Sequence, residues 1–249
     1  MFSQAVRDVM RATGRTDARE EIIAHVNGTI RECQILSFFS RDVITVEIPI
    51  TSLPFVFPRP SDLRQVLTVQ YSNGVFPRAI ELGRRIGDYE AYYYATNNGY
   101  EFSGISGVSS IKVAYVRYLP RLQYYETETE PAVYQDDKWQ YLVNGEYADT
   151  VLDLSDLPEV LPDEEGYDEY IAEVEARTEL ATLVEEALRK RVTNWLLDYW
   201  YDLVVSGAVA KILNTRGGEA DRRTAANYAQ YKQYQNSLMK SESQAINGV

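Results

Sequence analysis

Apolar residues recur at helical spacing most regularly between Thr182 and Met239, in two runs separated by Gly217-Gly218. The first run predicts one long buried helix that continues through Ile212, of roughly eight turns at about 3.6 residues each. A glycine pair ends a helix at little steric cost, so the second run is expected to fold back and form an antiparallel helical hairpin. Four aromatic residues of the first run are expected to provide an apolar girdle against which other helices pack: Trp195, Tyr199, Trp200 and Tyr201.

Two shorter helical patterns lie in the N-terminal region. Residues 2–13 have one apolar face, which predicts a short amphipathic helix. A second helix is expected to begin at Thr16 or Asp17, where a side chain can cap it, and to carry an apolar stripe as far as Cys33. We expect these helices, in residues 1–40, to complete a bundle with the C-terminal hairpin.

After Arg41 the pattern takes the period of β-strands. Residues 43–48 are rich in β-branched side chains, and later Asn-Gly pairs favour tight hairpin turns. The pattern predicts an antiparallel β domain of about five or six strands in residues 41–125. The expected strands include Leu63–Tyr71 followed by Val75–Leu82 in one hairpin, Tyr92–Thr96 followed by Tyr100–Ser103 in another, and Ile111–Leu119. The expected fold class is α+β, a helical bundle with an inserted antiparallel β domain.

The remaining segments are less regular. Residues 126–166 are interpreted as an acidic arm or loop, in which Asn144-Gly145 can form the turn of one more hairpin. Residues 167–240 contain the C-terminal helical hairpin, and residues 241–249 lack periodicity and are expected to form a flexible tail.

The net charge of -12 is distributed unevenly along the chain. The segment from Glu126 to Glu186 contains 20 acidic and 2 basic residues, a net charge of -18, so the remainder carries a net charge of +6. An acidic block repels phosphate, which argues against the chain as a whole being a nucleic-acid binder. The simplest interpretation of the block is a solvated, partly disordered insertion.

Composition places the protein in a broad class. With 249 residues and 45% hydrophobic content, the chain can bury a substantial core. A single cysteine, Cys33, excludes an intramolecular disulfide and fits folding in a reducing compartment. No stretch approaches the roughly 18 apolar residues of a membrane span, and the first residues lack the apolar run of a secretion signal. A soluble protein made in the cytoplasm, with no membrane partner, is therefore expected.

The sequence offers little for catalysis. His25 is the only histidine and has no partner motif around it, and the chain lacks glycine-rich phosphate loops, nucleophile elbows and zinc-ligand spacings. We expect no cofactor and rank an enzyme last. One dense acidic cluster can be considered for a divalent cation, but it lacks the alternating spacing and central glycine of a calcium loop. Its members are Asp163, Glu164, Glu165, Asp168 and Glu169.

The chain contains 20 tyrosines, and three of them are consecutive: Tyr92, Tyr93 and Tyr94. On a strand, consecutive side chains point to opposite faces, so at least one of these rings is expected to face out of the core. Tyrosine combines a rigid apolar body with a polar tip and is favoured at protein interfaces. The alternatives are an intersubunit or tail contact, a surface that stacks on sugars, and ordinary core and rim tyrosines.

The order of these segments resembles the head-to-tail adaptor, or connector, proteins of tailed bacteriophages. The resemblance rests on RDVMRATGRTDAREEIIAHVNGTIREC at the N-terminus, the β insertion, and the helix WYDLVVSGAVAKIL followed by AANYAQYKQYQNSLM. It covers most of the chain in architecture, although the acidic segment of residues 126–166 has no counterpart in it. The resemblance implies a ring, usually of twelve copies, between the portal and the tail or nozzle protein in the virion neck, and it implies no catalytic residues.

Under this resemblance, packaged DNA passes through the ring without specific binding, because a phosphate-binding wall would retard it. The acidic residues named above, from Asp163 to Glu169, are then candidates for the channel wall. An apolar C-terminal end is suited to ordering on the portal protein. The portal-docking candidates are Tyr231, Tyr234, Leu238, Met239 and Ile246, although Leu238 and Met239 can instead cap the core of the hairpin.

The sequence is also compatible with two other functions. An acidic inhibitor or DNA mimic would use the acidic segment to occupy a nucleic-acid-binding protein. A carbohydrate-binding tail module would use the tyrosines from Tyr92 to Tyr94.

Overall fold

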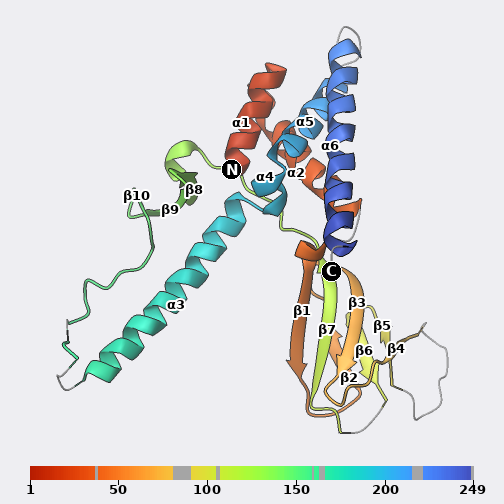
Figure 1. The fold of residues 1–249 in the computed structure, drawn as a ribbon, viewed down its shortest axis with the longest axis vertical. Coiled ribbons are helices and arrows are strands. Elements are labelled where there is room, and N and C mark those ends of the chain that lie inside the picture. The colour runs from red at the N-terminus through yellow and green to blue at the C-terminus, as the bar shows by residue number, and fades with distance from the viewer. Residues whose placement is uncertain are drawn as a thin grey trace. The chain divides into compact units, whose positions relative to one another are not determined.

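The computed structural model of the chain describes residues 1–36, 39–80, 91–104, 107–158, 160–162, 166–214 and 221–247, with backbone alone for 221–224 and 242–247. The fold is α+β: helices from both ends of the chain form a helical region, and an antiparallel β domain is inserted between them (Figure 1). The chain divides into two compact units. The helical unit comprises Met1–Cys33 and Pro120–Val249, and the β unit comprises Gln34–Leu119.

The bundle of the helical unit contains helices from both ends of the chain. α1 (Phe2–Thr13) packs on α5 (Tyr201–Asn214), and α5 packs along α6 (Asp221–Asn247). Figure 1 shows α5 and α6 running antiparallel, as the helical hairpin predicts, while Gly217-Gly218 lies outside the described residues. Large apolar side chains from α1, α2 (Arg19–Ile35), α5 and α6 are buried: Phe2, Val6, Ile22, Val26, Leu203, Val204, Ile212 and Leu238.

The prediction of one continuous helix through Ile212 is wrong. Helix α3 (Tyr167–Val192) ends at Val192, a short α4 (Trp195–Tyr199) follows, and α5 begins at Tyr201. Asn194 has an extended backbone, with φ -151° and ψ 171°, and its side chain accepts a hydrogen bond from the backbone N–H of Leu197 at 3.2 Å. Asparagine therefore starts a new helix here by capping it, which the apolar periodicity does not reveal.

The expected aromatic girdle is only partly formed. Trp195, Trp200 and Tyr201 are half-buried, but Tyr199 is 68% exposed.

The acidic segment before α3 is folded rather than disordered over most of its length. Strands β8 (Ala132–Gln135), β9 (Lys138–Val143) and β10 (Glu146–Ala148) form an antiparallel sheet in the order β10-β9-β8. The hairpin predicted at Asn144-Gly145 is confirmed, and both turn residues have positive φ, 52° and 89°, as a tight hairpin requires. We call residues 126–158 the acidic arm. It packs beside α3, and its core includes Ala132, Tyr141 and, from α3, Val192.

The β unit has one core lined by side chains from different sheets. One sheet has the order β1-β7-β3 (Val43–Pro49, Ser110–Arg117, Leu63–Tyr71), and another has the order β2-β6-β5-β4 (Phe55–Pro58, Gly99–Ser103, Tyr92–Ala95, Arg78–Ala79). The hydroxyl of Tyr71 in β3 donates to the carbonyl of Ser103 in β6 at 3.0 Å, which links the sheets through their shared core.

The predicted hairpins of the β unit have different outcomes. The hairpin of β5 and β6 is confirmed, with Tyr93 opposite Phe102. The hairpin between Leu63–Tyr71 and Val75–Leu82 is wrong, because the described residues after the turn contribute only β4, which pairs in parallel with β5. Asn-Gly sequences specify a turn, but cross-strand packing decides which strand becomes the neighbour.

The C-terminal segment also differs from the prediction. Helix α6 continues through Asn247, so residues 241–247 are helical rather than irregular. Within the ranges that the structure describes, no helix is both long and apolar enough to cross a membrane.

Candidate functional site

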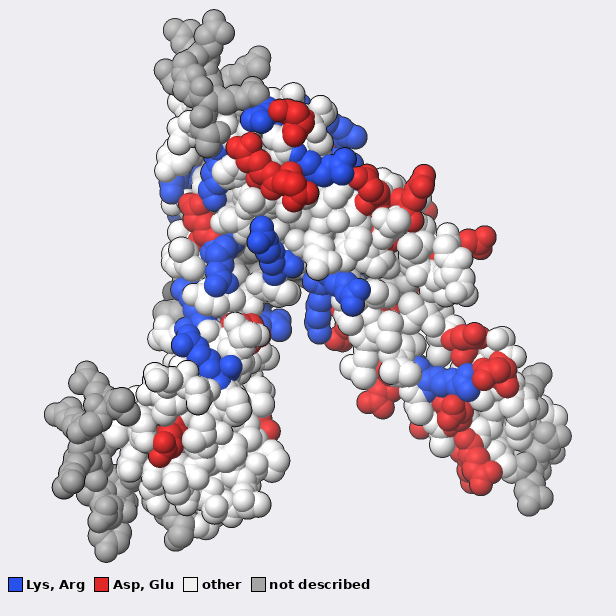
Figure 2. All heavy atoms as spheres, turned by 180° about the vertical axis from the view of Figure 1, so that it is seen from behind, with Lys and Arg blue, Asp and Glu red and all other residues white. Residues whose placement is uncertain are grey.

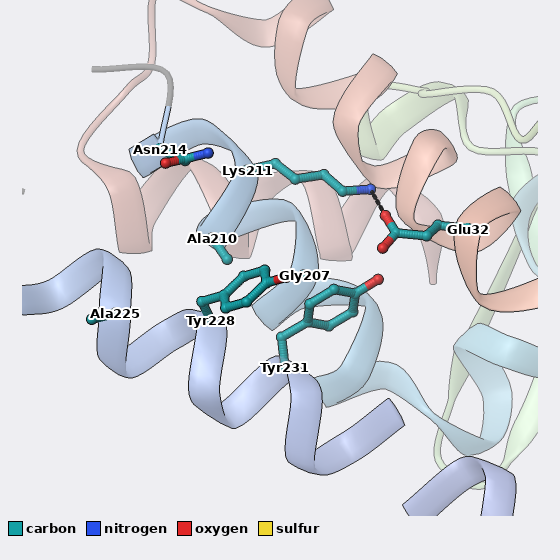
Figure 3. Close-up of a pocket in the computed structure, with 8 residues that line it drawn as sticks. All are labelled: Glu32, Gly207, Ala210, Lys211, Asn214, Ala225, Tyr228 and Tyr231. Carbon is teal, nitrogen blue, oxygen red and sulfur yellow. Dashed lines mark ion pairs between the residues drawn. The ribbon is translucent and has the colours of Figure 1, made fainter. Parts of the chain in front are cut away.

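A pocket of about 500 Å³ opens between α2, α5 and α6 (Figure 3). Small side chains and two tyrosine rings make most of its wall apolar, and a carboxylate and an ammonium group face each other at one side. Its lining residues are Glu32, Gly207, Ala210, Lys211, Asn214, Ala225, Tyr228 and Tyr231. Pockets of this size and lining are typical of binding sites for small molecules or for side chains of a partner.

The charged pair in the pocket joins two helices. Lys211 Nζ of α5 lies 2.6 Å from Glu32 Oε2 of α2. Burial alone raises the pKa of Glu32, but the hydrogen bond and charge of Lys211, with smaller contributions from Tyr231 and Gln235, bring the pKa below its ordinary value. The carboxylate is therefore ionised at neutral pH and is compensated within the protein.

Close packing holds the floor of the pocket in place. A Cβ at Gly207 would lie 2.5 Å from Cγ2 of Thr29 and 2.6 Å from Cε2 of Tyr231, so only glycine allows this approach of α5 to α2 and α6. Nearby, burial raises the pKa of the Cys33 thiol to about 12, with the neighbouring Tyr231 hydroxyl at 3.9 Å. A thiol of that pKa is not a nucleophile at neutral pH.

A second candidate surface lies on α3. Its exposed apolar residues follow the i, i+3, i+4, i+7 spacing of one helix face, so they form one stripe along the helix, which we call the α3 stripe. Leu180 is 61% exposed and Leu183 is 59% exposed. The α3 stripe consists of Ala172, Ala176, Leu180, Leu183, Val184 and Ala187.

The opposite side of α3 is held by the acidic arm. The guanidinium of Arg177 binds the carboxylate of Asp156, and Oε1 of Glu185 accepts hydrogen bonds from the Thr150 hydroxyl at 2.8 Å and the Val151 N–H at 3.2 Å. Contacts on that side leave the α3 stripe facing away from the arm. A single stable helix normally buries its apolar face, so this exposure is the unusual feature of the molecule.

Carboxylates flank the α3 stripe. Figure 2 shows acidic side chains along α3 and the chain before it, with uncharged surface between them, and both acidic and basic side chains on the helical bundle. The exposed acidic residues of α3 are Asp168, Glu169, Glu173, Glu175, Glu179 and Glu186.

The residues predicted to dock on the portal are distributed over different environments. Tyr231 and Leu238 are buried, at 2% and 0% exposure, so they are not available as an exposed contact surface. Tyr234 is half-buried and Met239 is 38% exposed. Ile246 lies in α6, and its side chain is outside the described part of the chain.

The three consecutive tyrosines divide between the faces of β5. Tyr93 packs inward against Phe102, with ring centroids 5.6 Å apart. The rings of Tyr92 and Tyr94 stack on each other with centroids 6.4 Å apart, and both residues are half-buried. Tyr92 and Tyr94 thus share the face of β5 opposite to that of Tyr93, as the alternation of side chains along a strand predicts.

Among the residues that the structure describes, the acidic cluster and the histidine do not form a recognisable site. Asp163, Glu164 and Glu165 lie outside the described residues, while Asp168 and Glu169 are exposed in the first turn of α3, where the helix dipole favours negative charge. No group of three potential metal ligands occurs within the described ranges. Nε2 of His25 lies 3.7 Å from Oε1 of Glu21 on the same helix, and His25 does not line the pocket.

Sequence reasoning missed both surfaces. It placed the residues after Thr182 in a long buried helix, although Glu179, Glu185 and Glu186 lie beside Leu183 and indicate an exposed helix. The pocket gave no signal, because its residues come from three helices. No model of a known protein family and no curated protein matches the chain.

Proposed function

We propose that this protein is a structural adaptor of a phage virion, which forms a ring between the portal protein and the tail or nozzle protein. The observation that carries the proposal is the α3 stripe, a long apolar face left uncovered on a helix that buries only Ala181 and Val192. Exposed apolar stripes of this kind mark protein–protein contacts. A component that is always held by neighbours in an assembly can keep such a face.

The charge distribution supports the same proposal. The acidic arm and the first turn of α3 present carboxylates at the surface, and a wall of that sign repels the phosphates of passing DNA instead of binding them. The proposed location is the neck of the virion, with self, portal and tail as partners and with DNA passing through the ring.

The proposed portal contact is the end of α6 and the residues beyond it. Tyr234, Met239 and Ile246 remain candidates, whereas Tyr231 and Leu238 belong to the bundle core. A truncation that tests this contact should therefore keep Leu238.

The test combines the purified protein with the portal ring encoded by the same genome and measures the mass of the complex by light scattering and by native mass spectrometry. A chain that ends at Ser241 is the comparison, because it retains the buried Leu238. The expected result is a stoichiometric ring on the portal, with binding lost or weakened in the shortened chain. A protein that stays monomeric and never binds the portal would refute the proposal.

One alternative is favoured by a specific observation. An exposed acidic helix can imitate the phosphates of DNA, so an inhibitor of a nucleic-acid-binding protein would also present α3 to solvent. Competition with DNA for a basic partner, lost when Glu175 and Glu179 are replaced by Gln, would favour this alternative. Apolar substitutions on the α3 stripe would then have little effect.

A further inference from the structure

The α3 stripe needs a partner of particular chemistry. Its residues span 16 positions, about 24 Å at roughly 1.5 Å per residue, so the partner surface must be similarly long. Between Ala172 and Ala187 the helix carries five acidic residues and one basic residue, Arg177, which already binds Asp156. The other basic residues of α3 lie in its last turn, beyond the stripe: Arg189, Lys190 and Arg191. Pairing two copies through α3 would place carboxylates against carboxylates. The partner surface must therefore be apolar and basic.

One such surface lies on α6 of the same protein. Residues 222–241 contain two arginines and two lysines and no acidic residue. Tyr228 is 53% exposed, and the ammonium group of Lys232 lies 5.4 Å from its ring centroid. We define the α6 outer face by its exposed residues at helical spacing: Ala225, Tyr228, Ala229, Lys232, Asn236 and Lys240.

The α6 outer face borders the pocket. Ala225 and Tyr228 belong to both, and Lys211 adds a further ammonium group at the pocket wall (Figure 3). Helices pack when side chains of one enter depressions on the other. Leu180 and Leu183 are exposed apolar side chains one turn apart, and the pocket offers an apolar depression beside a basic helix.

We propose that the α3 stripe of one copy docks on the α6 outer face of a second copy, with Leu180 or Leu183 entering the pocket. This inference rests on the proposed function, because it names the contact that builds the ring. The two surfaces are different, so each copy offers one to each neighbour. Contacts of that kind are head-to-tail, and they close into a ring when the rotation between neighbours permits.

The direct test is cross-linking of the full-length protein with a short bifunctional maleimide. Leu183→Cys is combined with Ala225→Cys in one chain, and the native Cys33 is buried. The expected product is a ladder of covalent multimers from the double variant. The two single variants should give only a covalent dimer, and only when they are mixed. Leu183→Cys with Ala12→Cys, an exposed residue of α1, is the matched control and should give no ladder.

A charge exchange provides an independent readout. Glu175→Lys with Glu179→Lys on α3, or Lys232→Glu on α6, should each weaken assembly about fivefold, and combining all three changes should restore most of it. Glu128→Lys, exposed on the acidic arm, is the control and should assemble normally.

The outcomes separate the two proposals. Rings that form, alone or on the portal, without the specific ladder would overturn this contact and leave the adaptor function standing. A protein that forms no ring under either condition would overturn both. A ladder that also appears with the Ala12→Cys control would show non-specific association and overturn the contact.

Discussion

Helices α3 and α5 have apolar positions at the same spacing but opposite surroundings. Leu203 of α5 is 0% exposed because α1 and α6 cover it, whereas Leu183 of α3 is 59% exposed because the acidic arm covers only the other side of its helix. The periodicity of a sequence indicates that a helix has an apolar face. It does not indicate whether the cover for that face lies in the same chain or in another.

The largest effect that distinguishes the two helices is expected from matched truncations of leucine. Leu203→Ala should lower the free energy of unfolding by about 2–5 kcal/mol, because it leaves a cavity in a packed core. Leu183→Ala should change it by less than about 0.5 kcal/mol in the isolated protein, because the side chain already contacts water. Chemical denaturation followed by circular dichroism measures both. Equal losses of unfolding free energy in the two variants would mean that Leu183 is buried in solution and that α3 and α5 do not differ in exposure.

The fold was largely predictable where one pattern decided the structure. The hairpin of β5 and β6, the turn at Asn144-Gly145 and the packing of α5 on α6 follow from local periodicity and turn residues. The break at Thr193 and Asn194 was missed, because a single capping side chain interrupts an apolar pattern that otherwise continues.

The candidate surfaces were less predictable, for a physical reason. The pocket needs Glu32, Gly207 and Tyr228, which lie far apart in sequence and meet only through helix packing. The exposure of the α3 stripe depends on where the other elements of the chain pack, and the acidic arm packs on another side of the helix. Neither property is encoded in the spacing of one segment.

A smaller effect on stability is expected from adding one methyl group at Gly207, where α5 packs closely against α2 and α6. Gly207→Ala should lower stability by about 1–3 kcal/mol, because its Cβ would overlap Thr29 and Tyr231. At the exposed Gly28 of α2, an added Cβ would have no atom within 4 Å. Gly28→Ala should therefore raise the free energy of unfolding by about 0.5–1 kcal/mol. On α3, the larger Ala176→Leu should be tolerated. Thermal unfolding compares the three, and a tolerated Gly207→Ala would show that the crossing is looser than described.

The smallest effect concerns the ion pairs of the two helices. Lys211 of α5 pairs with Glu32 of another helix, whereas Lys190 of α3 pairs with Glu186 within the same helix. The pKa of Glu32 is lower in the folded protein than its ordinary value of 4.5, so the folded state binds fewer protons than the unfolded chain around that pH. The stability that the ionised Glu32 contributes is fully present above pH 4.5 and is lost as the pH falls through its lowered pKa.

Glu32→Gln should therefore cost up to about 1 kcal/mol at neutral pH, a modest value because the carboxylate is partly exposed, and should flatten the loss of stability on the acid side. Glu186→Gln on α3 is the matched control, since it removes an exposed pair that ties no second helix to α3, and it should leave the acid-side loss in place. Denaturation midpoints measured from neutral pH down to pH 3 make the comparison. An acid-side loss unchanged by Glu32→Gln would mean that the pair does not help to hold α5 in the bundle, and the contrast with α3 would then rest on apolar packing alone.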